Sequence, residues 1–125
     1  MVEGDKIHVM SAGAHVHDTF PVAVNEISGA TKLYIIVEDK VYEDIDDKSV
    51  QKIRNDIKDS IQELRKIATP FVKNGVYEER IPEDSLEYIR DAVIRIYSEN
   101  KDATFFFNLS GGTKMLSIGL FMMGL

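Results

Sequence analysis

A short segment near the carboxyl end of the chain has the residue types that hold a phosphate group. Two consecutive glycines let a backbone approach a ligand closely and point successive N–H groups in one direction. Hydroxyls, an amide and a lysine ammonium flank them, and a helix that starts behind them would add a partial positive charge. The candidate anion-binding residues are Asn108, Ser110, Gly111, Gly112, Thr113 and Lys114.

This segment is not a P-loop, which needs a glycine, four further residues and then Gly-Lys followed by serine or threonine. Here Lys114 follows Thr113, and no glycine stands at the required upstream position. The plainer alternative is a glycine turn in which Thr113 only caps the following helix. The residues favour a phosphate cradle and leave that alternative open.

A second polar loop, residues 11–18, reads Ser-Ala-Gly-Ala-His-Val-His-Asp. Gly13 is its only glycine, so the loop does not match the dinucleotide-binding fingerprint. His15 and His17 would lie on one side of a strand and could hold a metal beside Asp18, but no third ligand is visible. We therefore expect no metal and no cofactor, and interpret the histidines as surface or ligand-contacting residues and Asp18 as a helix cap.

Strands and helices alternate four times along the chain. Short apolar runs predict strands at 6–10, 32–37, 76–81 and 104–107. Helical spacing predicts a helix after each strand, at about 18–29, 48–69, 84–100 and 115–125. The alternation predicts a Rossmann-like, doubly wound α/β fold, with a mainly parallel sheet in the order 3-2-1-4 and helices on both faces.

The ends and inner faces of these helices carry their own signals. Gly29 is a predicted left-handed stop, Gly75 a turn and Pro70 a helix end, while Asp84 and Glu87 form a pair of capping-box type. The apolar side chains expected to face the core are Val50, Ile53, Ile57, Ile61, Leu64 and Ile67 in the second helix, and Leu86, Ile89, Val93, Ile96 and Tyr97 in the third.

The composition restricts the classes of protein to which this chain can belong. With 125 residues, 44% of them apolar and 29% charged, the chain suits one globular domain. A net charge of -6 argues against a whole-surface affinity for DNA or an anionic membrane. The absence of cysteine excludes disulfides, thiolate metal sites and cysteine nucleophiles. No signal peptide is visible and no apolar run reaches the roughly 20 residues of a membrane span, so we expect a cytoplasmic protein.

Two further segments are interpreted from their residue types. Residues 38–47 hold six carboxylates and one lysine. They lack the ligand spacing of an EF-hand, so we expect a solvated loop rather than a metal site. The helix predicted at 115–125 is apolar nearly all round and has no polar cap. Such a helix is expected in a domain excised from a longer chain or in one whose last helix a partner buries, and we favour the excised domain.

The expected topology brings the two polar loops together. In an open α/β sheet, ligands bind beyond the carboxyl ends of the strands, where the strand order reverses. In the order 3-2-1-4 that point lies between the first and fourth strands. The loops that follow these strands are the two polar, glycine-bearing loops, residues 11–18 and 108–114. The sequence therefore predicts a binding site at this edge of the sheet.

The same loops make the chain resemble the CRISPR-associated Rossmann-fold (CARF) sensor domains. The likeness lies in SAGAHVHD after the first strand and, above all, in FFFNLSGGTKMLS at the fourth. It is closest to the branch at the amino terminus of archaeal winged-helix transcription regulators. Residues 1–125 would form a single CARF-like domain, without the later strands and the effector domain of the full family pattern.

The resemblance implies a homodimer that binds a cyclic oligoadenylate second messenger across its twofold axis. The ligand would control an attached winged-helix domain in CRISPR-linked defence, and DNA would be contacted only through that domain, which is absent from this chain. The ligand-binding residues that the resemblance implies are Ser11, Gly13, His15, Asn108, Ser110, Gly111, Gly112, Thr113 and Lys114.

Two other functions stay open. Some domains of this family cleave their ligand without metal, by attack of a ribose 2′-hydroxyl on the adjacent phosphate. In this chain Lys114 and Ser11 would be the catalytic residues of such a ring nuclease, with His15 or His17 as a general base. Alternatively, the chain is an unrelated α/β domain that binds a mononucleotide or mediates dimerisation. An unrelated α/β domain of this kind should show no preference for a cyclic oligonucleotide over an ordinary nucleotide.

Overall fold

The computed structural model describes residues 4–13 and 29–108. The elements within these ranges are β1 (Lys6–Ser11), β2 (Lys32–Glu38), the short 3-10 helix η1 (Asp39–Tyr42), α2 (Lys48–Ala68), β3 (Val76–Ile81), α3 (Leu86–Glu99) and β4 (Thr104–Asn108). The helices predicted at 18–29 and 115–125 fall outside the described residues.

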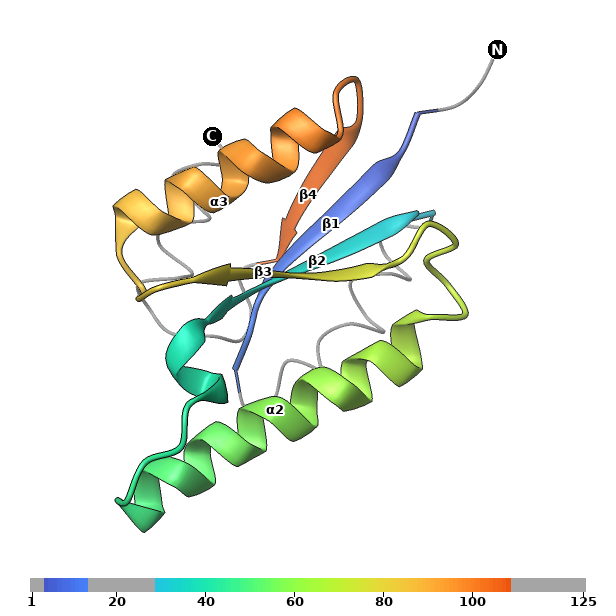
Figure 1. Cartoon of the computed structure of the whole chain (residues 1–125). Coiled ribbons are helices and arrows are strands. Elements are labelled where there is room, and N and C mark those ends of the chain that lie inside the picture. Colours follow the sequence, from blue (N-terminus) through green and yellow to red (C-terminus); the bar gives the residue numbers. More distant parts are fainter. Residues whose placement is uncertain (1–3, 14–28, 109–125) are drawn as a thin grey trace.

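The strands form one parallel sheet in the order β3-β2-β1-β4, as predicted (Figure 1). β1 lies between β2 and β4, so that Met10 is aligned with Ile35 on one side and Asn108 on the other. Helix α2 covers one face of the sheet and α3 the opposite face. Right-handed crossovers require this, because the chain reverses its direction across the sheet after β3. The Rossmann-like α/β fold is confirmed.

The alternation of side chains along the strands builds two apolar cores, one on each face of the sheet. The core under α2 contains Met10, Leu33, Ile35, Ile61 and Leu64, and the core under α3 contains Ile7, Val9, Ile36, Ile89 and Ile96. Covering both faces explains why β1 and β2 read as nearly continuous apolar runs rather than as alternating ones.

The two α-helices of the described ranges begin at side-chain caps. Asp47 accepts hydrogen bonds from two backbone N–H groups in the first turn of α2. In α3 the Ser85 Oγ accepts a hydrogen bond from the Tyr88 N–H at 3.4 Å. The predicted capping pair of Asp84 and Glu87 is therefore wrong, because Ser85 is the residue with extended backbone directly before the helix.

Most side chains predicted to face the core are buried or half-buried, but three are not. Ile53 of α2 is 57% exposed, and Leu86 and Tyr97 of α3 are 43% and 60% exposed. Ile53 and Leu86 lie near the start of their helices, and Tyr97 lies at the margin of its apolar stripe. The buried Ala92, which the spacing did not single out, contributes to the core under α3.

Two turn predictions hold and one loop prediction holds in part. Gly29 has a φ of +106°, the left-handed conformation predicted for it, although the helix that it was expected to end lies outside the described residues. Gly75, predicted as a turn, has a φ of +108°. The acidic run does not begin as a solvated loop, because η1 brings Val41 into the core and Glu38 is buried. Residues 43–47 are exposed, as expected.

A hydrogen-bonded group on the α2 side ties β3 to α2 and η1. The Glu78 carboxylate accepts hydrogen bonds from Arg65, whose Nη2 lies 2.8 Å from Oε2, and from the Tyr42 hydroxyl. The Arg80 guanidinium lies 3.9 Å from the centre of the Tyr42 ring. Burial alone would raise the pKa of Glu78, but the bonds from Tyr42 and Arg65 outweigh it and lower that pKa. Burial and Glu78 together raise the pKa of Tyr42 to about 12.

Replacing Glu78 with alanine should lower the free energy of unfolding by roughly 1–2 kcal/mol, because two half-buried donors lose their acceptor. Urea unfolding at pH 7 measures the change. The matched control is Glu79→Ala on the opposite face, where the carboxylate pairs with the half-exposed Arg95 at 2.6 Å. Its loss should cost less than about 1 kcal/mol. Equal stability of the two variants would contradict the structural role of Glu78.

Candidate functional site

The candidate site lies at the carboxyl edge of the sheet, where β1 and β4 end side by side (Figure 1). Met10 of β1 is aligned with Asn108, the last residue of β4, and Ser11 ends β1 one residue further on. Neighbouring strands of a sheet are about 4.8 Å apart. The segments that follow β1 and β4, which the sequence predicts to be loops, therefore start from adjacent points.

The first of these loops leaves the sheet from a closely packed segment. Ser11, Ala12 and Gly13 are all buried. The Ala12 N–H donates to the Ile36 carbonyl at 2.9 Å, so pairing with β2 continues past the end of β1. The backbone of the predicted pocket is thus held firmly at the point where this loop begins.

The structure places only part of the predicted site. Ser11, Gly13 and the backbone of Asn108 are described at the carboxyl edge. Their role toward a ligand stays a prediction. The predicted residues that lie outside the described ranges are His15, His17, Ser110, Gly111, Gly112, Thr113 and Lys114.

One residue at this edge escaped the sequence analysis. Glu38 ends β2, two residues beyond Ile36, which is aligned with Ser11. Its side chain is buried and its Oε2 lies 3.0 Å from the ammonium of the half-exposed Lys40. Because this carboxylate is matched by a cation, it adds little net negative charge to an edge that is expected to bind an anion. The signal available in the sequence was its place directly after an apolar strand.

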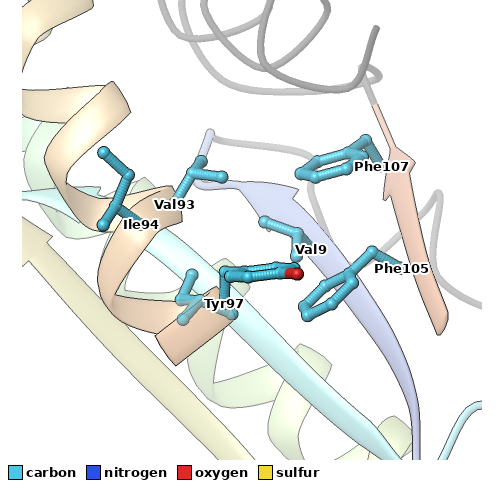
Figure 2. A pocket seen from close by; sticks show the side chains of 7 residues that line it. Val9, Val93, Ile94, Tyr97, Phe105 and Phe107 are labelled. Carbon is cyan, nitrogen blue, oxygen red and sulfur yellow. The ribbon is translucent and has the colours of Figure 1, made fainter. Parts of the chain in front are cut away.

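An apolar groove of about 300 Å³ opens on the α3 face of the sheet (Figure 2). Its lining residues are Val9, Val93, Ile94, Ile96, Tyr97, Phe105 and Phe107. The rings of Tyr97 and Phe105 lie 5.7 Å apart between centroids. The Tyr97 hydroxyl is the single polar side-chain group among these seven residues. The groove therefore suits apolar contacts and is not the phosphate site.

Residues 4–13 and 29–108 hold neither a metal-binding cluster nor a membrane-spanning helix. No three histidine, cysteine or carboxylate side chains of this part of the chain gather closely enough to hold a metal ion. No helix in it combines the length and the apolar character needed to cross a bilayer.

Comparisons with known proteins find structural likeness only. No family model matches the sequence, and no curated protein matches it either. Among solved structures, the chain is similar to Enterococcus italicus Csm6 bound to cyclic hexa-2′-fluoro-hexa-dAMP, with a TM-score of 0.54 and 10% sequence identity. The match covers 96% of this chain and 30% of the Csm6 chain. The chain thus has a Rossmann-like α/β fold similar to that of a part of Csm6.

Proposed function

We propose that the chain is a sensor domain of the CARF type, which binds a cyclic oligoadenylate at the carboxyl edge of its sheet. The observation that carries this proposal is the alignment of Met10 with Asn108, from which both polar loops start at adjacent points. The fold similarity to Csm6, solved with a cyclic nucleotide hexamer bound, supports the class of ligand.

The residues after β4 supply the chemistry that a phosphate needs. Backbone N–H groups of Gly111 and Gly112 would donate to phosphate oxygens, and Thr113 and Lys114 would add a hydroxyl and a cation. Ser11 and Gly13 would line the opposite wall, from the end of β1. A local set of donors outweighs the overall negative charge of the chain, because screening in salt limits distant charges.

The proposal includes a dimer and an effector. An isologous dimer presents each loop twice about a twofold axis. A ring made of an even number of identical nucleotides has the same twofold symmetry. Ligand binding would alter the geometry of the dimer and, through it, a winged-helix transcription-regulator domain. The chain spans about a third of the Csm6 chain that it matches, so the activity of a whole protein is part of the proposal.

Calorimetric titration with cyclic tetra-adenylate and cyclic hexa-adenylate tests the ligand, with linear oligoadenylate and AMP as controls. We expect one ring to bind per two chains, far more tightly than the controls. Chromatography of the nucleotide after incubation separates a sensor, which leaves the ring intact, from a metal-independent ring nuclease. A folded dimer that binds neither ring would refute the proposed function.

Replacing Lys114 with alanine should weaken binding of the preferred ring by about 1.5–3 kcal/mol, the scale of a charge-assisted hydrogen bond. The same titration measures this change. Lys66→Ala, at an exposed position on α2, removes the same charge away from the site and should leave the affinity unchanged. Equal affinities of the two variants would move the phosphate site away from the loop after β4.

A further inference from the structure

A second hollow lies at the opposite edge of the sheet, where the strands begin. Its walls come from four segments that are distant in sequence, residues 4–6, 29–31, 71–74 and 101–102. They are the first residue of β1 with the segment before it, the segment before β2, and the loops that enter β3 and β4 (Figure 1). The volume of this amino-edge hollow is about 800 Å³. That lies within the range of small-molecule sites.

The charges around the amino-edge hollow favour an anion. Lys6, Lys73 and Lys101 line it, against the two carboxylates of Asp5 and Asp102. Within the described part of the chain, neither Lys73 nor Lys101 forms an ion pair, and both side chains are exposed. In a chain with a net charge of -6, the hollow is thus a local region of positive charge.

The Asp5 carboxylate does not cancel this charge, because it is already engaged in holding three strands together. Its Oδ1 accepts hydrogen bonds from Thr31 Oγ1 at 2.8 Å and from Asn74 Nδ2 at 2.6 Å. Its Oδ2 lies 3.6 Å from the Lys32 ammonium. The hydrogen bonds from Thr31 and Asn74 lower the pKa of Asp5, with Lys32 adding to the effect.

An aromatic ring and an unusual backbone conformation accompany the lysines. Phe71, which lines the hollow, is 58% exposed, although most large apolar side chains of the described sheet are buried. A ring exposed beside cations is the arrangement that stacks on a nucleobase while the cations hold its phosphates. Asp102 has a φ of +68°, and its carbonyl packs so closely on Gly4 that a Cβ there would lie 3.0 Å from the oxygen. Such left-handed, tightly packed backbone is frequent in ligand-binding loops.

We propose that the amino-edge hollow binds a nucleotide, with Lys6, Lys73 and Lys101 on its phosphates and Phe71 against its base. The concave shape and the small number of cations favour a small ligand over a nucleic-acid strand, which needs a longer basic surface. This site is separate from the one proposed above, because the two lie at opposite edges of the sheet.

Calorimetric titration of the whole chain with ADP, and separately with pyrophosphate, tests this site. We expect both to bind, and the double variant Lys73→Glu/Lys101→Glu to weaken ADP binding roughly 30-fold, since two attractive contacts become repulsive. The control is Lys52→Glu/Lys66→Glu on exposed positions of α2, which makes the same change in net charge and should bind as the unchanged chain does. No ADP binding by the folded chain, or equal losses in both double variants, would overturn the proposal.

Phe71→Ala separates a nucleotide site from a simple anion site. It should weaken ADP binding roughly tenfold and leave pyrophosphate binding unchanged, because only the base stacks on the ring. Equal effects on both ligands would overturn the assignment to a nucleotide. A competition assay compares single-stranded RNA with unlabelled ADP as competitors for bound ADP. Displacement by RNA at the lower concentration would overturn the assignment to a small nucleotide in favour of a nucleic-acid surface. Lys114→Ala should leave ADP binding intact, so failure of the cyclic oligoadenylate site and failure of this site are distinguishable.

Discussion

Replacing Gly112 with valine should lower the affinity for the cyclic oligoadenylate by roughly 300-fold, or about 3.5 kcal/mol. A branched side chain at this position would keep the phosphate away from the N–H groups of the paired glycines, so several contacts would be lost together. The effect should exceed that of Lys114→Ala, which removes a single cation and leaves the backbone donors in place.

Titration of the ring into the Gly112→Val chain measures the loss, and thermal unfolding followed by circular dichroism tests the fold. Gly112→Ala is the matched control, because a methyl group obstructs less and should give an intermediate affinity. An affinity within threefold of the unchanged chain would contradict close backbone approach by the ligand. Unfolding of the variant would instead assign Gly112 a conformational role, as in the plain glycine turn.

The second large effect concerns His8 and the stability of the sheet in acid. His8 lies in the inner strand β1, with Leu33 and Phe106 aligned beside it, and its side chain is fully buried. Burial lowers its pKa from 6.5 to about 4, because the imidazolium form would be poorly solvated there. The folded state therefore keeps His8 neutral at pH values where the unfolded chain binds a proton.

The consequence is a loss of stability as the pH falls. Above pH 6.5 both states are neutral at His8 and its contribution is constant. Between pH 6.5 and about 4 the unfolded chain takes up a proton that the folded chain excludes, so the free energy of unfolding should decrease by roughly 3 kcal/mol. Below about pH 4 both states are protonated at this position and the loss levels off.

Urea unfolding at several pH values, for the unchanged chain and for His8→Leu, measures this effect. Leucine is apolar and suits the buried position, so the variant should lack this component of the pH dependence. The carboxylates contribute to acid denaturation in both chains, and the difference between the two curves isolates His8. Parallel curves between pH 6.5 and 4 would show that the pKa of His8 is the same in the folded and unfolded states.

Local patterns were sufficient for the strands and α-helices of the described residues and, with one topological rule, for the strand order. Apolar runs bounded by turn residues marked β1, β2, β3 and β4, and the spacing of apolar residues marked α2 and α3. Both patterns arise within a few neighbouring residues. The right-handed crossover rule then left few ways to arrange four parallel strands.

Local patterns failed where burial depends on what another element covers. Tyr97 fits the apolar stripe of α3 but lines an open groove beside Phe105, and Ile53 lies near the exposed start of α2. Glu38 belongs by composition to an acidic loop, yet the end of β2 places it inside, with Lys40 as its partner. The cap of α3 at Ser85 rather than Asp84 depends on backbone angles that residue types alone do not determine.

The sequence by itself determined the α/β class, because this follows from the order and type of neighbouring residues, and it singled out the two glycine-bearing polar segments that follow β1 and β4. Only the tertiary structure decided the register that aligns Met10 with Asn108, and that Phe71, Lys73 and Lys101 line one hollow at the other edge. The residues of the hollow have no regular spacing along the chain. Parallel strands brought them together, since pairing in a sheet joins segments irrespective of their separation in sequence.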